Sequence, residues 1–333
     1  MALFVLQPDD DLSGFCATGG LPALDATTVR AAGADLHLIA TGPAGQPAAR
    51  ASLWWTHAPP LAGETTGCIG HYAASEPEAA ATLLAAACAR LGAAGCTVAV
   101  GPLDGSTFRA YRFVTDFDLG GHARSPFFLE PTNPPDWPDQ FIAASFAPLA
   151  HYESAVMRLD GPDSRLTEMQ AHGASLGIRL RPVDLSVFEE EAARIYPVVM
   201  AAFRPNLLFA PISQAEFIGQ VAALRPLLHP SLVVLAERAG DVVGFLLALP
   251  DAEQARRGET VDTVILKTLA VLPEMSGARV GSLLTAAVHT NAHALGYGTA
   301  IHALMHVDNR SRRISAHYAR PFRRYTLFVR RLR

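Results

Sequence analysis

Residues 272–282 form the segment of the chain whose composition best suits the binding of a phosphate. They follow an apolar run typical of a strand and precede an amphipathic stretch typical of a helix. A helix N-terminus presents unpaired backbone N–H groups and the positive end of the helix dipole, which suit a pyrophosphate. Gly277 and Gly281 allow close backbone approach, and Arg279 can add a charge-assisted contact. Taken alone, the pattern also fits a plain turn between a strand and a helix.

Histidines are the next group with a chemical use. His302 and His306 alternate with Leu304 in a predicted strand, so both imidazoles are expected on one side of it. His306, near the C-terminal end, can accept a proton near neutral pH, and a hydrogen-bonded structural histidine is the alternative. His289 and His293 stand four residues apart in a predicted helix with no glutamate between them. The metalloprotease spacing is therefore absent, and a solvated helix face is expected.

The positive charge of the chain is almost entirely arginine. Lys267 is the only lysine, and an exposed position on a strand is expected for it. Residues 310–333 hold nine arginines and no acidic residue, which fits either contact with a phosphate or anionic acceptor, or a charged edge strand. The net charge of −4 and the isoelectric point near 6.3 argue against a nucleic-acid partner.

Length and composition indicate a folded protein of two domains. The chain has 333 residues, half of them apolar and 17% charged, so a sizeable core is expected. No apolar run reaches the roughly 18–20 residues that a membrane span needs. The first residues lack a basic segment and carry aspartates at positions 9–11, unlike a signal peptide. The sequence predicts a cytoplasmic protein without a membrane partner.

The four cysteines lie in the first half of the chain and lack the C-x-x-C spacing of zinc sites. They are predicted to be free thiols in the core rather than disulfides or metal ligands, and no metal cofactor is expected. They are Cys16, Cys68, Cys88 and Cys96.

Two regions of the chain show the same order of predicted elements. In the second half the periodicity predicts strands at 178–182, 232–237, 242–249, 260–271, 299–307 and 324–329, and helices at 185–203, 213–224, 281–295 and 311–318. In the first half it predicts strands at 35–40, 49–56, 67–72 and 96–100, a helix at 78–91 and a loop-rich region at 101–140. A polar cluster rich in Gly and Pro near 160–164 divides the chain into domains 1–160 and 161–333.

The stretch from Leu269 to Ser282 resembles the coenzyme A signature of the GNAT acetyltransferase superfamily, whose loop has the pattern R/Q-x-x-G-x-G/A. Ser276 stands where the family has Arg or Gln, Arg279 stands in place of the first glycine, and Gly281 keeps the second. Gly244, in Val-Val-Gly-Phe, resembles another strand of the family, and Asn309 resembles its asparagine after the fifth strand. The resemblance implies coenzyme A contacts from Leu269, Ala270, Val271, Ser276, Gly277, Ala278, Arg279, Val280, Gly281, Ser282 and Asn309.

The resemblance covers residues 178–329, and it implies an α/β (α+β) fold of two tandem GNAT-like domains. Each would have a mixed, mostly antiparallel central sheet flanked by helices. The first half has no glycine-rich phosphate loop and resembles a degenerate copy. Members of the family transfer acetyl directly from acetyl-CoA to an amine, here of a small molecule or peptide, with an oxyanion donor expected near residues 269–271.

The family commonly has a tyrosine about seven residues after its asparagine as the general acid, but this chain has alanine at position 316. Tyr318 is therefore the candidate acid, with Tyr325 as another choice, and His306 is the candidate base. The missing tyrosine favours one alternative function, a non-catalytic coenzyme A-binding module. A third is aminoacyl transfer from charged tRNA, which the acidic isoelectric point disfavours.

Two further features leave alternatives open. Residues 126–135 place aromatic residues beside prolines, and they fit either one wall of an acceptor pocket or a linker between the halves. Two fused copies can supply internally the pairing that single-copy relatives obtain by dimerising, so the protein is expected to be a monomer or a homodimer.

Overall fold

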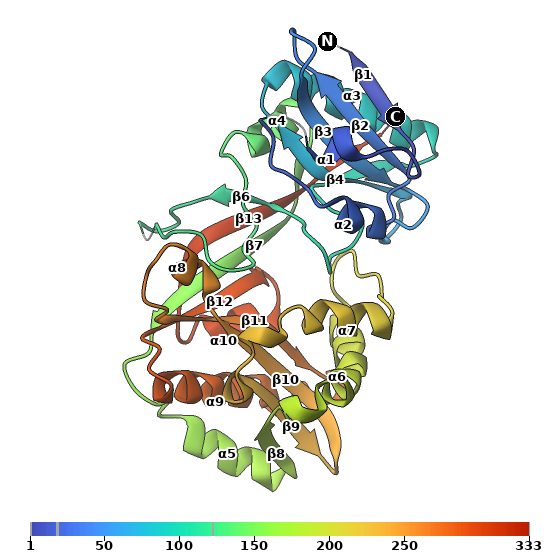
Figure 1. The fold of residues 1–333 in the computed structure, drawn as a ribbon. Helices are drawn as coiled ribbons and strands as arrows, with labels where there is room; N and C mark the ends of the chain where they lie inside the picture. Colours follow the sequence, from blue (N-terminus) through green and yellow to red (C-terminus); the bar gives the residue numbers. More distant parts are fainter. Residues whose placement is uncertain (1, 18–19, 122, 333) are drawn as a thin grey trace.

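The computed structural model describes residues 2–17, 20–121 and 123–332. In this part of the chain, thirteen strands form one continuous sheet that runs through two lobes (Figure 1). The strand order is β1-β2-β3-β4-β5-β13-β7-β12-β11-β10-β9-β8, and β6 pairs with β13 beside this path.

The strands of the first half are β1 (Leu3–Leu6), β2 (Leu36–Thr41), β3 (Pro47–Trp54), β4 (Thr66–Ala74), β5 (Val98–Gly101), β6 (Phe113–Asp116) and β7 (Ala147–Arg158). Its helices are α1 (Ser13–Cys16), α2 (Ala26–Ala31), α3 (Pro77–Ala93) and α4 (Trp137–Ala143), and α5 (Leu166–Ser175) follows β7. The strands of the second half are β8 (Ile178–Pro182), β9 (Val233–Arg238), β10 (Asp241–Pro250), β11 (Thr263–Val271), β12 (Thr299–His306) and β13 (Arg320–Arg331). Its α-helices are α6 (Phe188–Phe203), α7 (Gln214–Ala222), α8 (Ala252–Arg256), α9 (Val280–Ala294) and α10 (Arg310–Ser315). Short 3-10 turns occupy Leu185–Val187, Arg225–Leu227, Pro230–Leu232 and Pro273–Met275.

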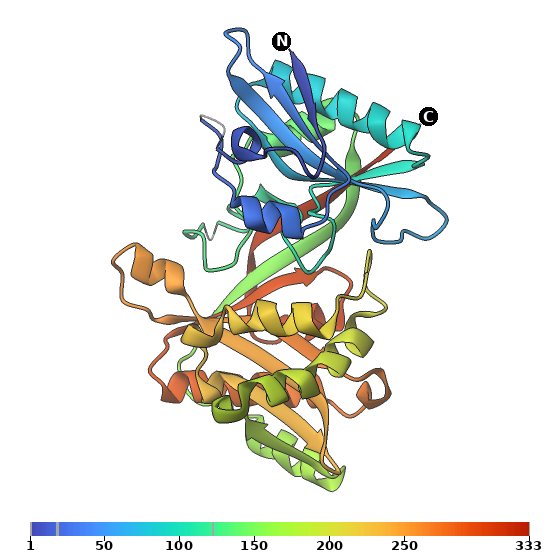
Figure 2. The ribbon, with the colours of Figure 1, turned by 45° about the vertical axis from the view of Figure 1, so that its right-hand side comes forward.

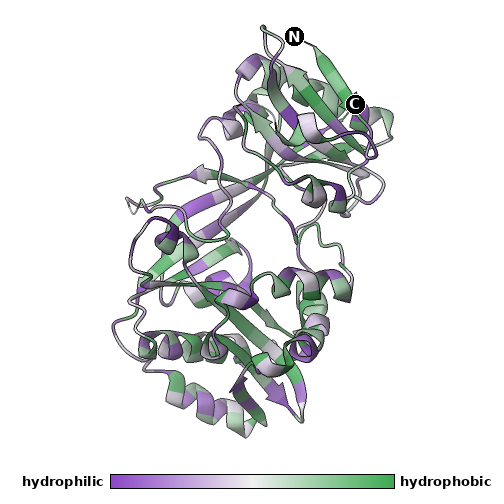
Figure 3. Ribbon diagram, in the orientation of Figure 1, coloured by the Kyte–Doolittle hydropathy of each residue, from purple (hydrophilic) through white to green (hydrophobic). Residues whose placement is uncertain are grey.

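The order of elements predicted from residue 178 onward is confirmed, with the short helix α8 added between β10 and β11; α5, which precedes β8, lies outside the predicted elements. Helix α9 packs against β9, β10 and β11, and α6 packs against β10 and β11. The two helices bury separate clusters of apolar side chains, so they cover opposite faces of this part of the sheet. Figure 3 shows the hydrophobic residues concentrated on the strands of both lobes.

The first half repeats this plan with α3 between the parallel strands β4 and β5. Its predicted strands and helix are confirmed, but the region 101–140, expected to be loop, contains β6 and the start of α4, and β1, α1 and α2 lie outside the predicted elements. The twelve-residue strand β7 is also absent from the predictions. Its centre carries Glu153 and Ser154, which are buried, and their charged and hydroxyl partners lie more than 150 residues away in the chain. The sequence pattern around β7 alone does not reveal these distant partners, so it does not predict the strand.

Strands β7 and β13 join the two lobes. β13 pairs with β5 of the first half and with β7, while β7 pairs with β13 and with β12 of the second half. Figure 2 shows both strands crossing from one lobe to the other. The last strand of each half is thus placed within the sheet of the other. The domain boundary near residue 160 stays a prediction, since the sheet itself is continuous across it.

The cysteine prediction is confirmed, because all four thiols are free and buried. None of the described helices is long and apolar enough to cross a membrane.

A buried ion pair fastens the segment at residues 126–131 to the joining strands. Arg323 Nη1 of β13 donates to Glu130 Oε2 at 2.7 Å, and the two side chains are 3% and 0% exposed. The Tyr325 hydroxyl donates to the Glu130 carboxylate and lies 3.0 Å from Ser154 Oγ of β7, from which it can accept. Phe127 packs beside this group against Phe322. The segment is therefore a link between the halves, and Leu129, Glu130 and Pro131 also line the central cavity described below.

We expect Arg323→Met to lower the free energy of unfolding by about 3–5 kcal/mol, because it leaves the Glu130 carboxylate buried without its cation. Urea unfolding at neutral pH measures the change. Arg158→Met is the matched control: Arg158 and its partner Asp160 are 75% and 77% exposed, so its loss is expected to stay below about 1 kcal/mol. Equal, small losses in both variants would contradict the role given to the buried pair.

Candidate functional site

The two parallel strands at the centre of the second half separate part-way along their length. β11 and β12 pair from Thr263 and Thr299 up to Leu266 and His302. Beyond these residues β11 continues against β10, and β12 continues against β7. In the described chain, the facing backbone edges of residues 267–271 and 303–306 therefore have no strand partner. Leu304 N donates to Ser154 Oγ and its carbonyl accepts from Arg112, and the other N–H and C=O groups on these edges are available to a ligand.

A β-bulge lies where the strands separate. Leu247 and Ala248 are consecutive in β10, but their partners in β11 are Thr268 and Leu266, so Lys267 is an extra residue. A bulge re-aims the side chain of the extra residue. Lys267 lines the cavity beside the gap instead of being exposed, so the expectation of an exposed strand lysine is wrong.

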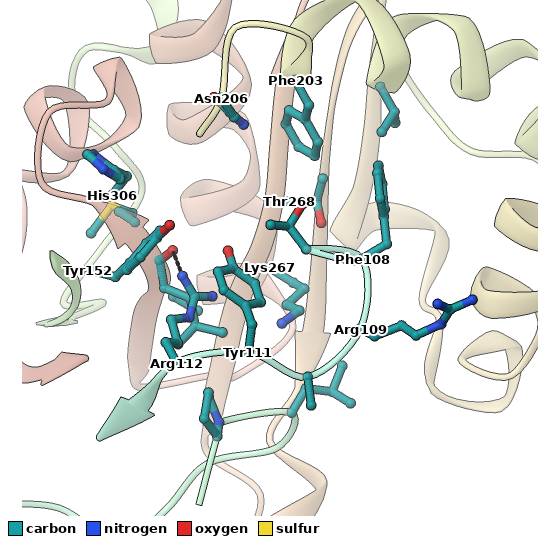
Figure 4. Close-up of a pocket in the computed structure, with 18 of the residues that line it drawn as sticks. Phe108, Arg109, Tyr111, Arg112, Tyr152, Phe203, Asn206, Lys267, Thr268 and His306 are labelled. Atoms are coloured by element: carbon teal, nitrogen blue, oxygen red, sulfur yellow. Dashed lines mark hydrogen bonds between the residues drawn. The ribbon is translucent and has the colours of Figure 1, made fainter. Parts of the chain in front are cut away.

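The gap opens into a cavity of about 1910 Å³ between the two lobes. Residues of both halves line it, including Tyr111 and Arg112 from the first half and Thr268, Leu269 and His306 from the second (Figure 4). Most pockets for a single small ligand measure roughly 300–1,000 Å³. The cavity is large enough for two molecules to meet in it.

The loop at residues 276–279 and the start of α9 lie beside this gap. Arg279 has φ 57°, in the left-handed region, and α9 begins at the next residue. Within the described chain, the amides of Val280, Gly281 and Ser282 donate to no other residue. Gly277 has open space around the position of a Cβ atom. The four loop residues are partly or fully exposed, so the amides at the start of α9 face an accessible loop.

Two arginines predicted near a phosphate differ in where they lie. Arg279 Nη1 is 3.5 Å from Glu168 Oε1 of α5, so its guanidinium contacts a residue outside the loop. Arg310 Nη1 lies 3.5 Å from the Ser276 carbonyl oxygen and is the arginine that contacts the loop. Asn309 lines the cavity and precedes α10, whose Ile314 would lie 3.0 Å from a Cβ atom at Gly281.

The corresponding place in the first half is closed by the chain itself. β4 and β5 also pair only briefly, up to Cys68 and Val100. Leu103 N then donates to the Ile69 carbonyl at 2.8 Å, and the carboxylate of Asp104 accepts from His71 N at 2.6 Å. Glu76 and Glu78 stand at the start of α3. The gap is thus filled by protein groups, and two glutamates place negative charge near the positive end of the helix dipole.

A chain of buried polar groups runs from the cavity toward α5. His302 of β12 lines the cavity, and its Nε2 lies 2.9 Å from His289 Nε2 of α9. His289 Nδ1 faces Asp163 Oδ2 at 3.8 Å. Burial lowers the pKa of both histidines, while the neighbouring imidazole of His289 holds the pKa of Asp163 well below its usual range. Two neutral imidazoles in contact can pass a proton by exchanging tautomers.

This group corrects two expectations. His289 is 1% exposed, so it does not lie on a solvated helix face. His302 and His306 do not share one side of β12, because three residues of β12 span two residues of β7 at this point. Leu304, with φ 59°, is in the irregular stretch. His302 contacts α9, whereas the His306 ring packs edge-on against Tyr152, 5.0 Å away.

No protein-family model matches the chain, and no curated protein matches its sequence. Solved structures do match its fold. The GCN5-related glucosamine N-acetyltransferase region of a fungal multi-domain GH3 β-N-acetylglucosaminidase has a TM-score of 0.55 and 13% identity, over 99% of this chain and 38% of that one. A GCN5-related N-acetyltransferase from Sphaerobacter thermophilus has a TM-score of 0.52 and 14% identity, over 99% and 96%. A tandem GNAT protein from the clavulanic acid biosynthesis pathway has a TM-score of 0.51 and 12% identity, over 100% and 99%.

The chain has the tandem GNAT fold. The fold class inferred from residues 269–282 is thereby confirmed. This chain spans less than half of the fungal protein that it matches. At these identities the likeness concerns the fold, and the chemistry of the site rests on its own residues.

The predicted site residues fall in two places in this GNAT fold. Leu269 and Asn309 line the cavity, and the residues from Ser276 to Ser282 form the loop and the first turn of α9 beside it. His306 lines the cavity, and burial lowers its pKa, which favours the neutral form that can accept a proton. Tyr318 packs against His289, with ring centroids 4.6 Å apart. It is not among the residues that line the cavity.

The sequence did not single out Arg112, Asp163 or the pairing of His289 with His302. The solitary lysine was the one available signal for this part of the site, since a lysine is seldom placed in a protein's interior without a reason. The cavity environment changes the pKa of this lysine. Burial, and then the charge of Arg112, lower the pKa of Lys267 from 10.5 to about 8.

We expect the Lys267 ammonium group to titrate near pH 8, and its single NMR signal in protein labelled with ¹³Cε- and ¹⁵Nζ-lysine measures this directly. Arg112→Gln removes the smaller cause, so it should raise the pKa while leaving it below 10.5. A titration of the unchanged protein centred at 10.5 would show that Lys267 is solvated and would remove it from the cavity.

Proposed function

We propose that this protein is an acyltransferase that moves the acetyl group of acetyl-CoA directly to an amine of a small molecule or peptide. The observation that carries the proposal is the separation of β11 from β12, with the unpaired amides of α9 at one end and the central cavity at the other. An unpaired strand edge can bind an extended, amide-bearing ligand, and a helix N-terminus can bind a diphosphate.

The residues present fit coenzyme A. The amides of Val280, Gly281 and Ser282 would hold the diphosphate, and the small residues Gly277 and Ala278 leave room beside it. Leu269, Ala270 and Val271 would accept the pantetheine arm along the open edge of β11, with Asn309 on the opposite side. Ser276 and Arg279 complete the predicted loop, and Arg310 supports it through the Ser276 carbonyl.

Acetyl-CoA, when bound, supplies a thioester whose carbonyl carbon is open to attack by an amine. The open backbone N–H groups of residues 267–271 are placed to stabilise negative charge on the carbonyl oxygen. The C–N bond forms as the C–S bond breaks, the amine loses a proton, and the sulfur leaves as a thiolate that takes one up. The chain must therefore provide a proton acceptor and admit a proton donor.

Two histidines can take the proton of the amine. His306 lines the cavity and its pKa is lowered by burial. His302 also lines it, with Nε2 already engaged by His289, which leaves Nδ1 for a proton from the cavity. His289 Nε2 can exchange a hydrogen bond with His302 Nε2, and the Asp163 carboxylate lies 3.8 Å beyond His289 Nδ1. Tyr318 remains the proposed general acid. Its ring packs against His289 and does not line the cavity, so this role requires the hydroxyl to move toward the thiolate.

We expect Gly277→Asp to weaken the binding of acetyl-CoA by about tenfold or more, because a carboxylate at the loop repels the diphosphate. The position is exposed and no heavy atom lies within 4 Å of a Cβ atom there, so the fold should tolerate the change. Isothermal titration calorimetry measures the affinity, and the release of free thiol in the presence of an amine panel measures the reaction.

Gly277→Asn is the matched control, since asparagine has the same shape without the charge. It is expected to bind within a few-fold of the unchanged protein. Equal affinity in the aspartate and asparagine variants would contradict the placement of the diphosphate. Binding of acetyl-CoA without thiol release, with every amine tested, would favour a coenzyme A-binding module over an enzyme.

We expect one acetyl-CoA to bind per chain. The first half has protein groups in its strand gap and two glutamates at the start of α3, and both features oppose a second diphosphate site. Calorimetric stoichiometry tests this with no variant needed. Two sites per chain, or one site that Gly277→Asp leaves unchanged, would place the cofactor in the first half.

A further inference from the structure

Two cations in the central cavity have no counter-ion in the part of the chain that the structure describes. Arg112 and Lys267 both line it (Figure 4), and among the described residues no carboxylate forms an ion pair with either. Of the ion pairs that involve the cavity, Arg109 pairs with Glu216 at 2.8 Å and Glu130 pairs with Arg323 at 2.7 Å. Placing two cations together in a half-dry cavity is unfavourable unless an anion joins them.

The remaining cavity acids are also engaged elsewhere. Asp104 accepts from the backbone N–H of His71 at 2.6 Å, and its Oδ2 lies 3.6 Å from His71 Nε2. Asp308 is 88% exposed at the side chain, and its nearest cation is His306, 3.9 Å away. The protein therefore supplies no anion to Arg112 and Lys267 from within the described chain.

The guanidinium of Arg112 is held in a fixed place. Its Cζ lies 4.1 Å from the ring centroid of Tyr111 and 4.2 Å from that of Tyr152, as in cation–π contacts. Nη1 donates to the Leu304 carbonyl at 3.3 Å, and the side chain is buried, with its Nε unpartnered in the described chain. Its backbone has φ 66°, a conformation that costs non-glycine residues energy and persists where surrounding contacts hold it.

Lys267 approaches the same space from the β-bulge in β11. The charge of Arg112 is one of the two causes that depress the Lys267 pKa, as expected for two cations that line the same cavity. The bulge lies at the point where β11 leaves β12, so the pair of cations stands next to the proposed site of acyl transfer. Phe108, Phe203 and Phe209 supply apolar walls nearby.

We propose that Arg112 and Lys267 bind a carboxylate of the acceptor, so that the substrate is an amine that also carries a carboxylate and an apolar portion. This rests on the proposed function and deepens it. The rigid edge of the Arg112 guanidinium can form two parallel hydrogen bonds with a planar carboxylate. The ammonium group of Lys267 adds a second positive charge beside it. The carboxylate fixes one end of the acceptor while the apolar walls hold the rest, which directs the amine toward the gap between β11 and β12.

The single lysine makes this testable without knowing the acceptor and without acetyl-CoA. 3-Phenylpropionate is added to protein carrying labelled lysine, at constant ionic strength, and 3-phenylpropionamide serves as its neutral counterpart of the same shape. The carboxylate should shift the Lys267 signal saturably and raise its pKa from about 8, because an adjacent anion favours the ammonium form. The amide should do neither. An equal response to both, or none to the carboxylate, overturns the proposal.

Arg112→Gln should weaken the binding of 3-phenylpropionate by about tenfold or more, whereas Arg109→Gln should change it by less than about twofold, since Arg109 already has a carboxylate partner. If melting shows that the glutamine variant is unfolded, Arg112→Lys, which keeps the charge but lacks the planar edge, takes its place with the same expected loss. Equal affinities in the Arg112 and Arg109 variants overturn the proposal.

Binding measurements with two other anions, inorganic phosphate and coenzyme A, identify the kind of anion that Arg112 and Lys267 bind. Inorganic phosphate should bind more weakly than the carboxylate, and tighter binding of phosphate overturns the proposal. Saturating coenzyme A should leave the affinity for 3-phenylpropionate unchanged, and displacement would show that the cations belong to the cofactor's phosphates. The carboxylate titration stands even where coenzyme A fails to bind, so failure of the proposed function and failure of this inference give different results.

Discussion

The candidate site lies where two parallel strands separate. β11 and β12 share four pairs of residues before they diverge. A sheet normally satisfies every backbone N–H and C=O group in its interior, and an open edge there is costly unless water or a ligand supplies the missing hydrogen bonds. Here β11 stays with β10 and β12 stays with β7 once they pass Leu266 and His302. The gap, the bulge at Lys267 and the cavity beside them all follow from that separation.

The separation depends on strands from both halves. β12 is drawn away from β11 because its second neighbour is β7, and β7 is held in turn by β13, the last strand of the chain. Glu130, Arg323 and Tyr325 lock a loop of the first half onto these two strands. The cavity therefore exists only when both halves are assembled, and Tyr111 and Arg112 of the first half line it together with residues of the second.

The sequence predicts the parts of this arrangement that depend on residues close together in the chain. Helix α9, its loop and the strands around it follow from periodicity, Gly281 and the stretch at residues 269–271, and the tandem GNAT fold follows from these. β7 was missed because its buried Glu153 is paired with arginines of β13 and α10, far away in the chain. His302, His306 and Lys267 were misplaced because bulges in β11 and β12 change which side a residue faces, and alternation cannot reveal a bulge.

A crystal structure of the protein with coenzyme A tests the central claim most directly. We predict diphosphate density against the amides of Val280, Gly281 and Ser282, and a pantetheine arm between residues 267–271 and residues 303–306, with its sulfur facing the cavity. Coenzyme A bound at the start of α3, or bound outside the gap while β11 and β12 stay apart, would contradict the account.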